Sequence, residues 1–204
     1  MVKKKCKKQK RKHVRFMAII SGVLLIMIAF FLSLRGLSTP FIDQEQTDET
    51  QTHEAFINQL APYAKELQTG YGVLPSIILG QAILESNWGK STLSSQYNNL
   101  FGIKAYGNQK KVNLETKEFV NEEWITIQGD FRVYESWEQS MDSHTQLFVN
   151  GVDWNPALYE KVITATDYRE AAQALQDAGY ATDPSYAQKI IQVIETYHLD
   201  QYDQ

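Results

Sequence analysis

One stretch near the middle of the chain, residues 76–86 (SIILGQAILES), is apolar on almost every side of the helix that it predicts. Only Gly80 and Gln81 interrupt its hydrophobic positions. A helix that is apolar all round belongs inside a hydrophobic core. Pro75 has a fixed backbone angle that suits the first turn of a helix, and Ser76 is predicted to cap that turn. We therefore expect the other elements to pack around this helix.

Apolar residues before this stretch recur at intervals of three and four. This spacing predicts an amphipathic helix that begins at Glu54 and closes at Gly70. Its inward positions are Phe56, Leu60, Tyr63, Ala64 and Leu67. Residues 90–107 are rich in Ser, Asn and Gly, and we expect a loop there.

The pattern then changes from helical to strand-like. Residues 112–120 and 123–129 are rich in Val, Phe, Trp, Ile and Thr, and Asn121-Glu122 is a suitable turn between them. Residues 131–134 predict a further short extended piece. Together these segments predict a small β-hairpin lobe.

Helical signals return after residue 135. Ser136 precedes Gln139 by three residues, and Asp167 precedes Glu170 by three; each pair is typical of a helix N-terminus. A last helix is predicted to open at Asp183-Pro184. The inward positions of the three helices are Trp137, Met141, His144 and Phe148, then Ala171, Ala172 and Leu175, then Tyr186, Ile190, Ile194 and Tyr197. The chain thus predicts an α+β fold, mostly helical.

Charge is distributed unevenly along the 204 residues. Residues 1–16 hold nine Lys or Arg and no acid, whereas residues 36–204 hold ten Lys or Arg against all 24 acids. Between these parts, the nineteen residues of Phe16–Leu34 carry no charge, close to the roughly 20 that span a bilayer. We expect an uncleaved membrane anchor, with cleavage as a signal peptide as the alternative.

This reading divides the chain into four parts. They are a basic cytoplasmic tail (1–15), a transmembrane segment (16–35), a polar linker (36–53) and a domain (54–204) on the outer side of the membrane. The single cysteine, Cys6, lies in the tail, so the outer domain has no disulfide. Its acidic charge argues against a nucleic-acid partner.

Glu85 is the first acidic residue after the apolar run. A carboxyl group at the rim of such a helix is poorly solvated, which raises its pKa. A carboxylic acid that stays protonated near neutral pH can donate a proton to a glycosidic oxygen. The alternative is that Glu85 is simply the first exposed residue after a buried segment.

Five short runs in the order AILESNWGKS, NNLFGIK, TKEF, FRVYESWEQS and AGYATDPSYAQKI cover most of residues 54–199. This order resembles the glucosaminidase domains of glycoside hydrolase family 73, which include bacterial autolysins. The resemblance implies a lysozyme-like fold whose β-lobe flanks a cleft. It also implies cleavage of the β-1,4 bond after N-acetylglucosamine in peptidoglycan strands. The implied residues are Glu85 as general acid, Glu118 as second carboxylate and Tyr180 in the site.

Glu118 has a weaker argument of its own. In a strand it shares a face with Val112, Leu114 and Thr116, where an acid is unusual unless it faces a cleft. Glu115, Glu122 and Glu123 compete with it for the role of second carboxylate. The separation of the two carboxylates, and hence the stereochemical outcome, stays open.

Aromatic and loop residues complete the predicted sugar site. Trp88 and Tyr180 are candidates because flat aromatic rings cover the apolar faces of sugars. The run Asn98–Lys104 adds Asn99, Phe101 and Gly102 beside the acid. Tyr186 and Tyr197 fall on helix stripes and are expected in the core, and Trp124 and Trp154 could serve either purpose.

No metal or cofactor is predicted, because the four histidines have no ligand spacing and no phosphate-binding loop occurs. The expected partners are peptidoglycan strands and the cytoplasmic membrane. A lytic transglycosylase or muramidase of the same fold remains an alternative. A wall-binding or assembly module without turnover is a further alternative.

Overall fold

The computed structural model describes residues 40–120 and 123–203. The predicted basic tail (1–15) and membrane segment (16–35) lie outside these residues. In the part that is described, no helix combines the length and apolar character needed to cross a membrane. The chain divides into two compact units between Thr52 and His53, and the second unit holds all the elements that form the site.

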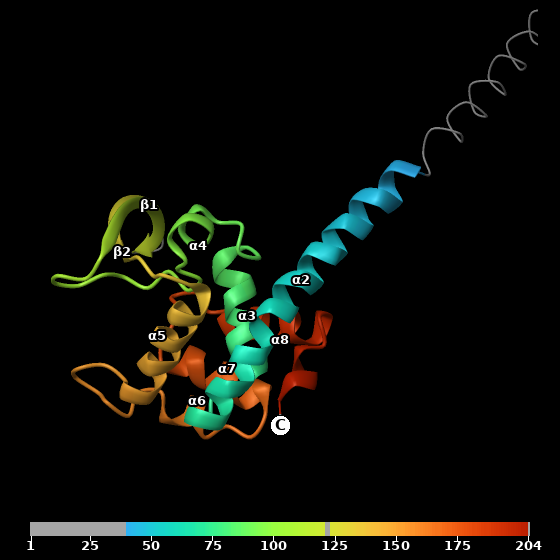
Figure 1. Cartoon of the computed structure of the whole chain (residues 1–204). Coiled ribbons are helices and arrows are strands. Elements are labelled where there is room, and N and C mark those ends of the chain that lie inside the picture. Colours follow the sequence, from blue (N-terminus) through green and yellow to red (C-terminus); the bar gives the residue numbers. More distant parts are fainter. Residues whose placement is uncertain (1–39, 121–122, 204) are drawn as a thin grey trace, which may run out of the picture. The chain divides into compact units, whose positions relative to one another are not determined.

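The fold is mostly helical with one antiparallel pair of strands (Figure 1), as the sequence predicts. The elements in chain order are α2 (Pro40–Tyr71), α3 (Pro75–Ser86), α4 (Thr92–Tyr97), β1 (Lys111–Val120), β2 (Glu123–Arg132), α5 (Trp137–Asn150), α6 (Glu160–Ile163), α7 (Tyr168–Asp177), α8 (Tyr186–Thr196) and the 3-10 helix η1 (Leu199–Tyr202).

Helix α3 lies in the core and packs on α7, α8 and η1. Its residues from Pro75 to Ile83 are buried, which confirms the prediction from the apolar pattern. Gly80 allows a close approach of α8, because a Cβ atom there would lie 3.3 Å from Ile194 Cγ1. The helix that carries Glu85 is therefore held on all sides.

The first turn of α3 differs from the prediction. Leu74 stands at the N-cap and provides no side-chain hydrogen bond, so Ser76 is not the cap. Instead, the carboxylate of Asp203 accepts hydrogen bonds from the Ser76 N–H (2.8 Å) and hydroxyl (2.6 Å). At the other end Asn87 is the C-cap residue and takes the left-handed conformation that stops the helix. A residue far away in sequence thus supplies the anion that the first turn needs.

Helix α2 begins at Pro40, and the prediction of a helix that starts only at Glu54 is wrong. The polar residues 40–53, predicted as a linker, continue the same helix. Adding a turn to a helix that is already formed costs far less than starting one. The packed residues from Phe56 onward therefore provide the nucleus that the polar stretch lacks.

The predicted loop 90–107 contains a short helix, α4. Its N-cap is Ser91, whose hydroxyl accepts a hydrogen bond from the Ser94 N–H (3.2 Å). The indole N–H of Trp137 donates to the Ser94 carbonyl (3.0 Å). Six residues are too few to show a hydrophobic period, so tertiary contacts rather than pattern define this helix.

The hairpin of β1 and β2 confirms the predicted β-lobe. The register pairs Val112 with Phe131 and Glu118 with Ile125, and β2 runs on through Arg132 instead of ending at Gly129. The hairpin is joined to the helical part where the Tyr134 N–H donates to the Tyr97 carbonyl (3.0 Å).

The predicted helix starts are confirmed at α5 and α7. The Ser136 hydroxyl accepts from the Gln139 N–H, and the Asp167 carboxylate accepts from the N–H groups of Arg169 and Glu170. The last helix starts later than predicted, at Tyr186 rather than at Asp183.

Gly89 lies in the turn after α3, against side chains of α5 and α2, and we predict that Gly89→Ala destabilises the fold strongly. Its φ is +72°, and an added Cβ would lie 2.8 Å from Trp137 Cη2 and 2.9 Å from Phe56 Cε2. Gly107→Ala is the matched control, because Gly107 also has a positive φ (+57°) but no neighbour within 4 Å. The free energy of unfolding should fall by about 1–3 kcal/mol more for Gly89→Ala, the usual cost of overpacking. Equal losses in denaturant titrations would contradict this packing argument.

Candidate active site

Glu85 lies in the last turn of α3, where the apolar run ends. Its side chain is exposed to solvent, yet surrounding protein removes enough water that burial raises the pKa of the carboxyl group. A hydrogen bond from Tyr186 opposes part of this rise. The carboxyl group is therefore accessible and biased toward its protonated form, as a general acid must be.

Tyr186 and Gln81 hold the Glu85 carboxyl group. The hydroxyl group of Tyr186 lies 2.7 Å from Glu85 Oε1, and the side-chain amide of Gln81 donates to the same hydroxyl oxygen (3.0 Å). Gln81 and Glu85 stand four residues apart on α3, so their side chains share one face. Tyr186 approaches that face from the first turn of α8.

Tyr180 lies beside this group. Its ring stacks on the ring of Tyr186, with centroids 5.6 Å apart and planes 19° apart. Burial raises the pKa of the Tyr180 hydroxyl well above its usual value, and the nearby Glu85 charge adds to the rise. The phenol thus stays neutral. The structure brings Glu85 and Tyr180 together.

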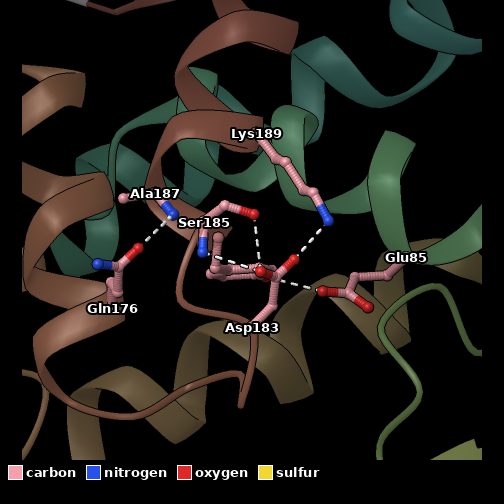
Figure 2. Close-up of polar contacts among 7 residues, drawn as sticks. Glu85, Gln176, Asp183, Ser185, Ala187 and Lys189 are labelled. Carbon is pink, nitrogen blue, oxygen red and sulfur yellow. Dashed lines mark hydrogen bonds and ion pairs between the residues drawn. The ribbon is translucent and has the colours of Figure 1, made fainter. Parts of the chain in front are cut away.

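The loop between Tyr180 and Tyr186 is braced by Asp183 (Figure 2). The Asp183 carboxylate accepts from the Ser185 N–H (2.8 Å) and hydroxyl (2.7 Å) and pairs with Lys189. These contacts lower the pKa of Asp183 to about 2, and the contact with Lys189 contributes most. The Ala187 N–H donates to the Gln176 side chain (3.0 Å). Both tyrosines are therefore held by a charged, hydrogen-bonded turn.

A second loop, residues 98–104, is shaped by Asn99. Its amide donates to the carbonyls of Ile103 (2.9 Å) and Arg132 (2.8 Å), and its carbonyl accepts from the Ile103 N–H (3.0 Å). Gly102 takes a positive φ of +66° within this turn. Asn99 is buried, so its described contacts are with the protein, and direct contact with a sugar stays a prediction.

Phe101 connects this loop with the tyrosines. Its ring stacks on the imidazole of His144 at 3.8 Å, and the edge of His144 meets Tyr180 at 5.8 Å. His144 is fully buried on α5, and burial lowers its pKa to about 3. His144 is therefore a neutral aromatic spacer between the two loops, which agrees with the packed role expected from its helix face.

Trp88 lies in a cluster of aromatic rings. It stacks on His53 (3.6 Å between centroids) and meets Tyr197 and Phe56 edge-on. One face of the indole is therefore covered within the protein. Its predicted contact with sugar remains a prediction.

The residue predicted as second carboxylate, Glu118, lies on β1, where the backbone register pairs it with Ile125. Along β1, Lys111, Asn113 and Glu115 are exposed, whereas Val112, Leu114 and Thr116 are half-buried. This alternation confirms the expected strand period over residues 111–116. Glu115, the competitor of Glu118, belongs to the exposed set.

Sequence reasoning missed Tyr186 and Gln81 as parts of the site. It placed Tyr186 in the core, which its burial confirms, but gave no hint of its partner 101 positions earlier. The available signal was Gln81, a polar residue inside an apolar helix, one turn before the acid. Among the described residues, no three His, Cys, Asp or Glu side chains gather as metal ligands.

The chain is similar in sequence to known proteins over the whole of this site. Residues 61–199 match the family model of mannosyl-glycoprotein endo-beta-N-acetylglucosaminidase. The exo-glucosaminidase LytG of Bacillus subtilis is 44% identical over 206 residues, covering 100% of this chain and 71% of LytG. A probable N-acetylmuramidase of Lactococcus lactis is 40% identical over 76% of this chain but only 36% of its own length.

Solved structures share the fold as well. The catalytic domain of the autolysin Auto from Listeria monocytogenes has a TM-score of 0.68 at 34% identity. The match covers 79% of this chain and 97% of that domain.

Proposed function

The chain belongs to the endo-beta-N-acetylglucosaminidase family and is a glycoside hydrolase acting on peptidoglycan, and from this premise we propose which bond it cleaves. The bond is the β-1,4 linkage between N-acetylglucosamine and N-acetylmuramic acid, on the N-acetylglucosamine side. The match to an exo-glucosaminidase along the whole chain supports this choice and favours release from chain ends.

The carboxyl group of Glu85 carries the proposal. It is exposed, its pKa is raised by burial, and a tyrosine fixes its position. In its neutral form it would protonate the glycosidic oxygen as the bond to the anomeric carbon breaks. Because the acid must be protonated, activity is expected below its raised pKa and is lost as the pH rises through that value.

Glu118 is proposed as the second carboxylate, on β1. It would activate a water molecule or stabilise positive charge at the anomeric carbon. Its support is the strand period, which separates it from the exposed Glu115, and the TKEF run that resembles the family. A β-lobe carboxylate can also complete the site through movement of the lobe.

A muramidase is the second candidate, because the Lactococcus relatives are named as probable N-acetylmuramidases. The test is digestion of purified peptidoglycan by the full chain in detergent, followed by borohydride reduction and mass spectrometry. We expect reduced N-acetylglucosamine at the new ends. Reduced N-acetylmuramic acid would establish the muramidase, and anhydro ends would establish a transglycosylase.

We predict that Glu85→Gln lowers kcat by about 10²–10⁴-fold, the typical contribution of general acid catalysis. Glu118→Gln should give a smaller loss, and Glu115→Gln is its matched control on the other face of β1. Release of reducing ends measures all three. Near-normal turnover of Glu85→Gln would remove Glu85 from the mechanism, and a greater loss from Glu115→Gln would move the second carboxylate.

We also propose that Phe16–Leu34 anchors the enzyme in the cytoplasmic membrane, with the hydrolase domain on the outer side. The support is the uncharged run and the basic residues before it. The full chain should stay in the membrane fraction after carbonate washing, and a variant lacking residues 1–35 should not. Release of the full chain by carbonate, or a shortened N-terminus by mass spectrometry, would contradict the anchor.

A further inference from the structure

Three polar groups form a directed chain of hydrogen bonds that ends on the acid. The Gln81 amide nitrogen, the Tyr186 hydroxyl oxygen and Glu85 Oε1 are joined by distances of 3.0 and 2.7 Å. Gln81 is fully buried and Tyr186 is nearly so. Buried polar groups with fixed partners have few alternative arrangements.

The direction of these hydrogen bonds follows from the chemistry of the groups. An amide nitrogen only donates, so the Tyr186 oxygen must accept the proton of Gln81. The hydroxyl proton of Tyr186 is then free to point at Glu85 Oε1. Oε1 is thereby an acceptor, and the proton of the neutral carboxyl group belongs on Oε2.

We propose that Tyr186, held by Gln81, is a positioning residue that makes Oε2 the oxygen that delivers the proton. The proposal rests on the role of Glu85 as general acid. In the step, the Oε2–H bond breaks and its electron pair stays on Glu85. The proton bonds to the glycosidic oxygen, which leaves the anomeric carbon with the electrons of the broken bond. Glu85 is then a carboxylate that accepts from Tyr186.

This hydrogen bond strengthens as the reaction proceeds. A hydroxyl group donates more strongly to a carboxylate than to a neutral acid. An interaction that is stronger in the transition state than in the ground state raises kcat. Tyr186 itself does not touch the substrate in this scheme; it acts through Glu85.

The surroundings of Tyr186 keep its phenol neutral. Burial raises the pKa of Tyr186, and the neighbouring Tyr180 and Glu85 raise it further. Tyr180 in turn is influenced by Tyr134 and Tyr159 and meets the neutral His144. On α8 and the preceding loop, Lys189 is paired with Asp183. Glu85 is therefore the acidic group in this set whose protonation the neighbouring phenols can influence, with a pKa that burial raises above its ordinary value.

The test is Tyr186→Phe in the full chain, measured as kcat and KM across pH. The hydrogen bond from Tyr186 lowers the pKa of Glu85, so its removal should raise that pKa. The basic limb of the kcat profile should move to higher pH, and kcat should fall by about 10- to 100-fold, as for the loss of a hydrogen bond to a charged group. KM should stay unchanged.

Tyr168→Phe is the matched control. It also removes a hydroxyl bonded to a carboxylate, that of Glu195 (3.3 Å), but on the exposed surface. Gln81→Met is the second variant. It removes only the amide that donates to the Tyr186 hydroxyl group, so it should move the basic limb of the kcat profile in the same direction but by less. If Tyr186→Phe does not fold, the double variant Gln81→Met/Tyr186→Phe removes the unpaired amide as well.

The outcomes distinguish the positioning role of Tyr186 from the general-acid role of Glu85. If Tyr186→Phe and Gln81→Met lose activity but the basic limb of the pH profile does not move, the positioning role of Tyr186 is wrong. If Glu85→Gln is inactive in the same experiment, Glu85 is still the general acid. If Glu85→Gln retains turnover, the general acid itself is wrong. A shift in Tyr168→Phe equal to that in Tyr186→Phe would also overturn the proposal.

Discussion

The structure depends on burying a helix that has no polar face. Because α3 is apolar all round, helices must surround it. Gly80 lets α8 come close to α3, since a Cβ atom there would crowd Ile194. This enclosure also removes water from the last turn, where Glu85 stands. The same hydrophobic burial that stabilises the fold therefore raises the pKa of the group proposed to act as the acid.

Two braced turns then set what surrounds the acid. The side chain of Asn99 ties one turn by hydrogen bonds to the backbone of Ile103 and Arg132. The carboxylate of Asp183 ties the other through Ser185 and Lys189. The buried ring of His144 lies between Phe101 of the first turn and Tyr180 at the start of the second. Both loops therefore contact the same neutral side chain, that of His144, so their positions depend on each other.

The elements that follow from the sequence are those with local causes. Burial of α3, the caps at Ser136 and Asp167 and the β-hairpin arise from residues within a few positions of one another. What the sequence does not reveal depends on distant partners: Asp203 at the start of α3, Trp137 on α4, and Tyr186 on Glu85. The helical residues 40–53 were missed for a related reason, since the packed part of α2 after them provides the nucleus.

The contact between Asp203 and Ser76 has a consequence for where the catalytic domain ends. The family match stops at residue 199, but the anion on the first turn of α3 comes from Asp203, four positions later. A shortened form cut at the family boundary would leave the N–H and hydroxyl groups of Ser76 without this carboxylate, at the start of the helix whose other end holds Glu85. The working domain boundary of this enzyme therefore lies beyond the segment matched by the family model, at the carboxylate that bonds the first turn of α3.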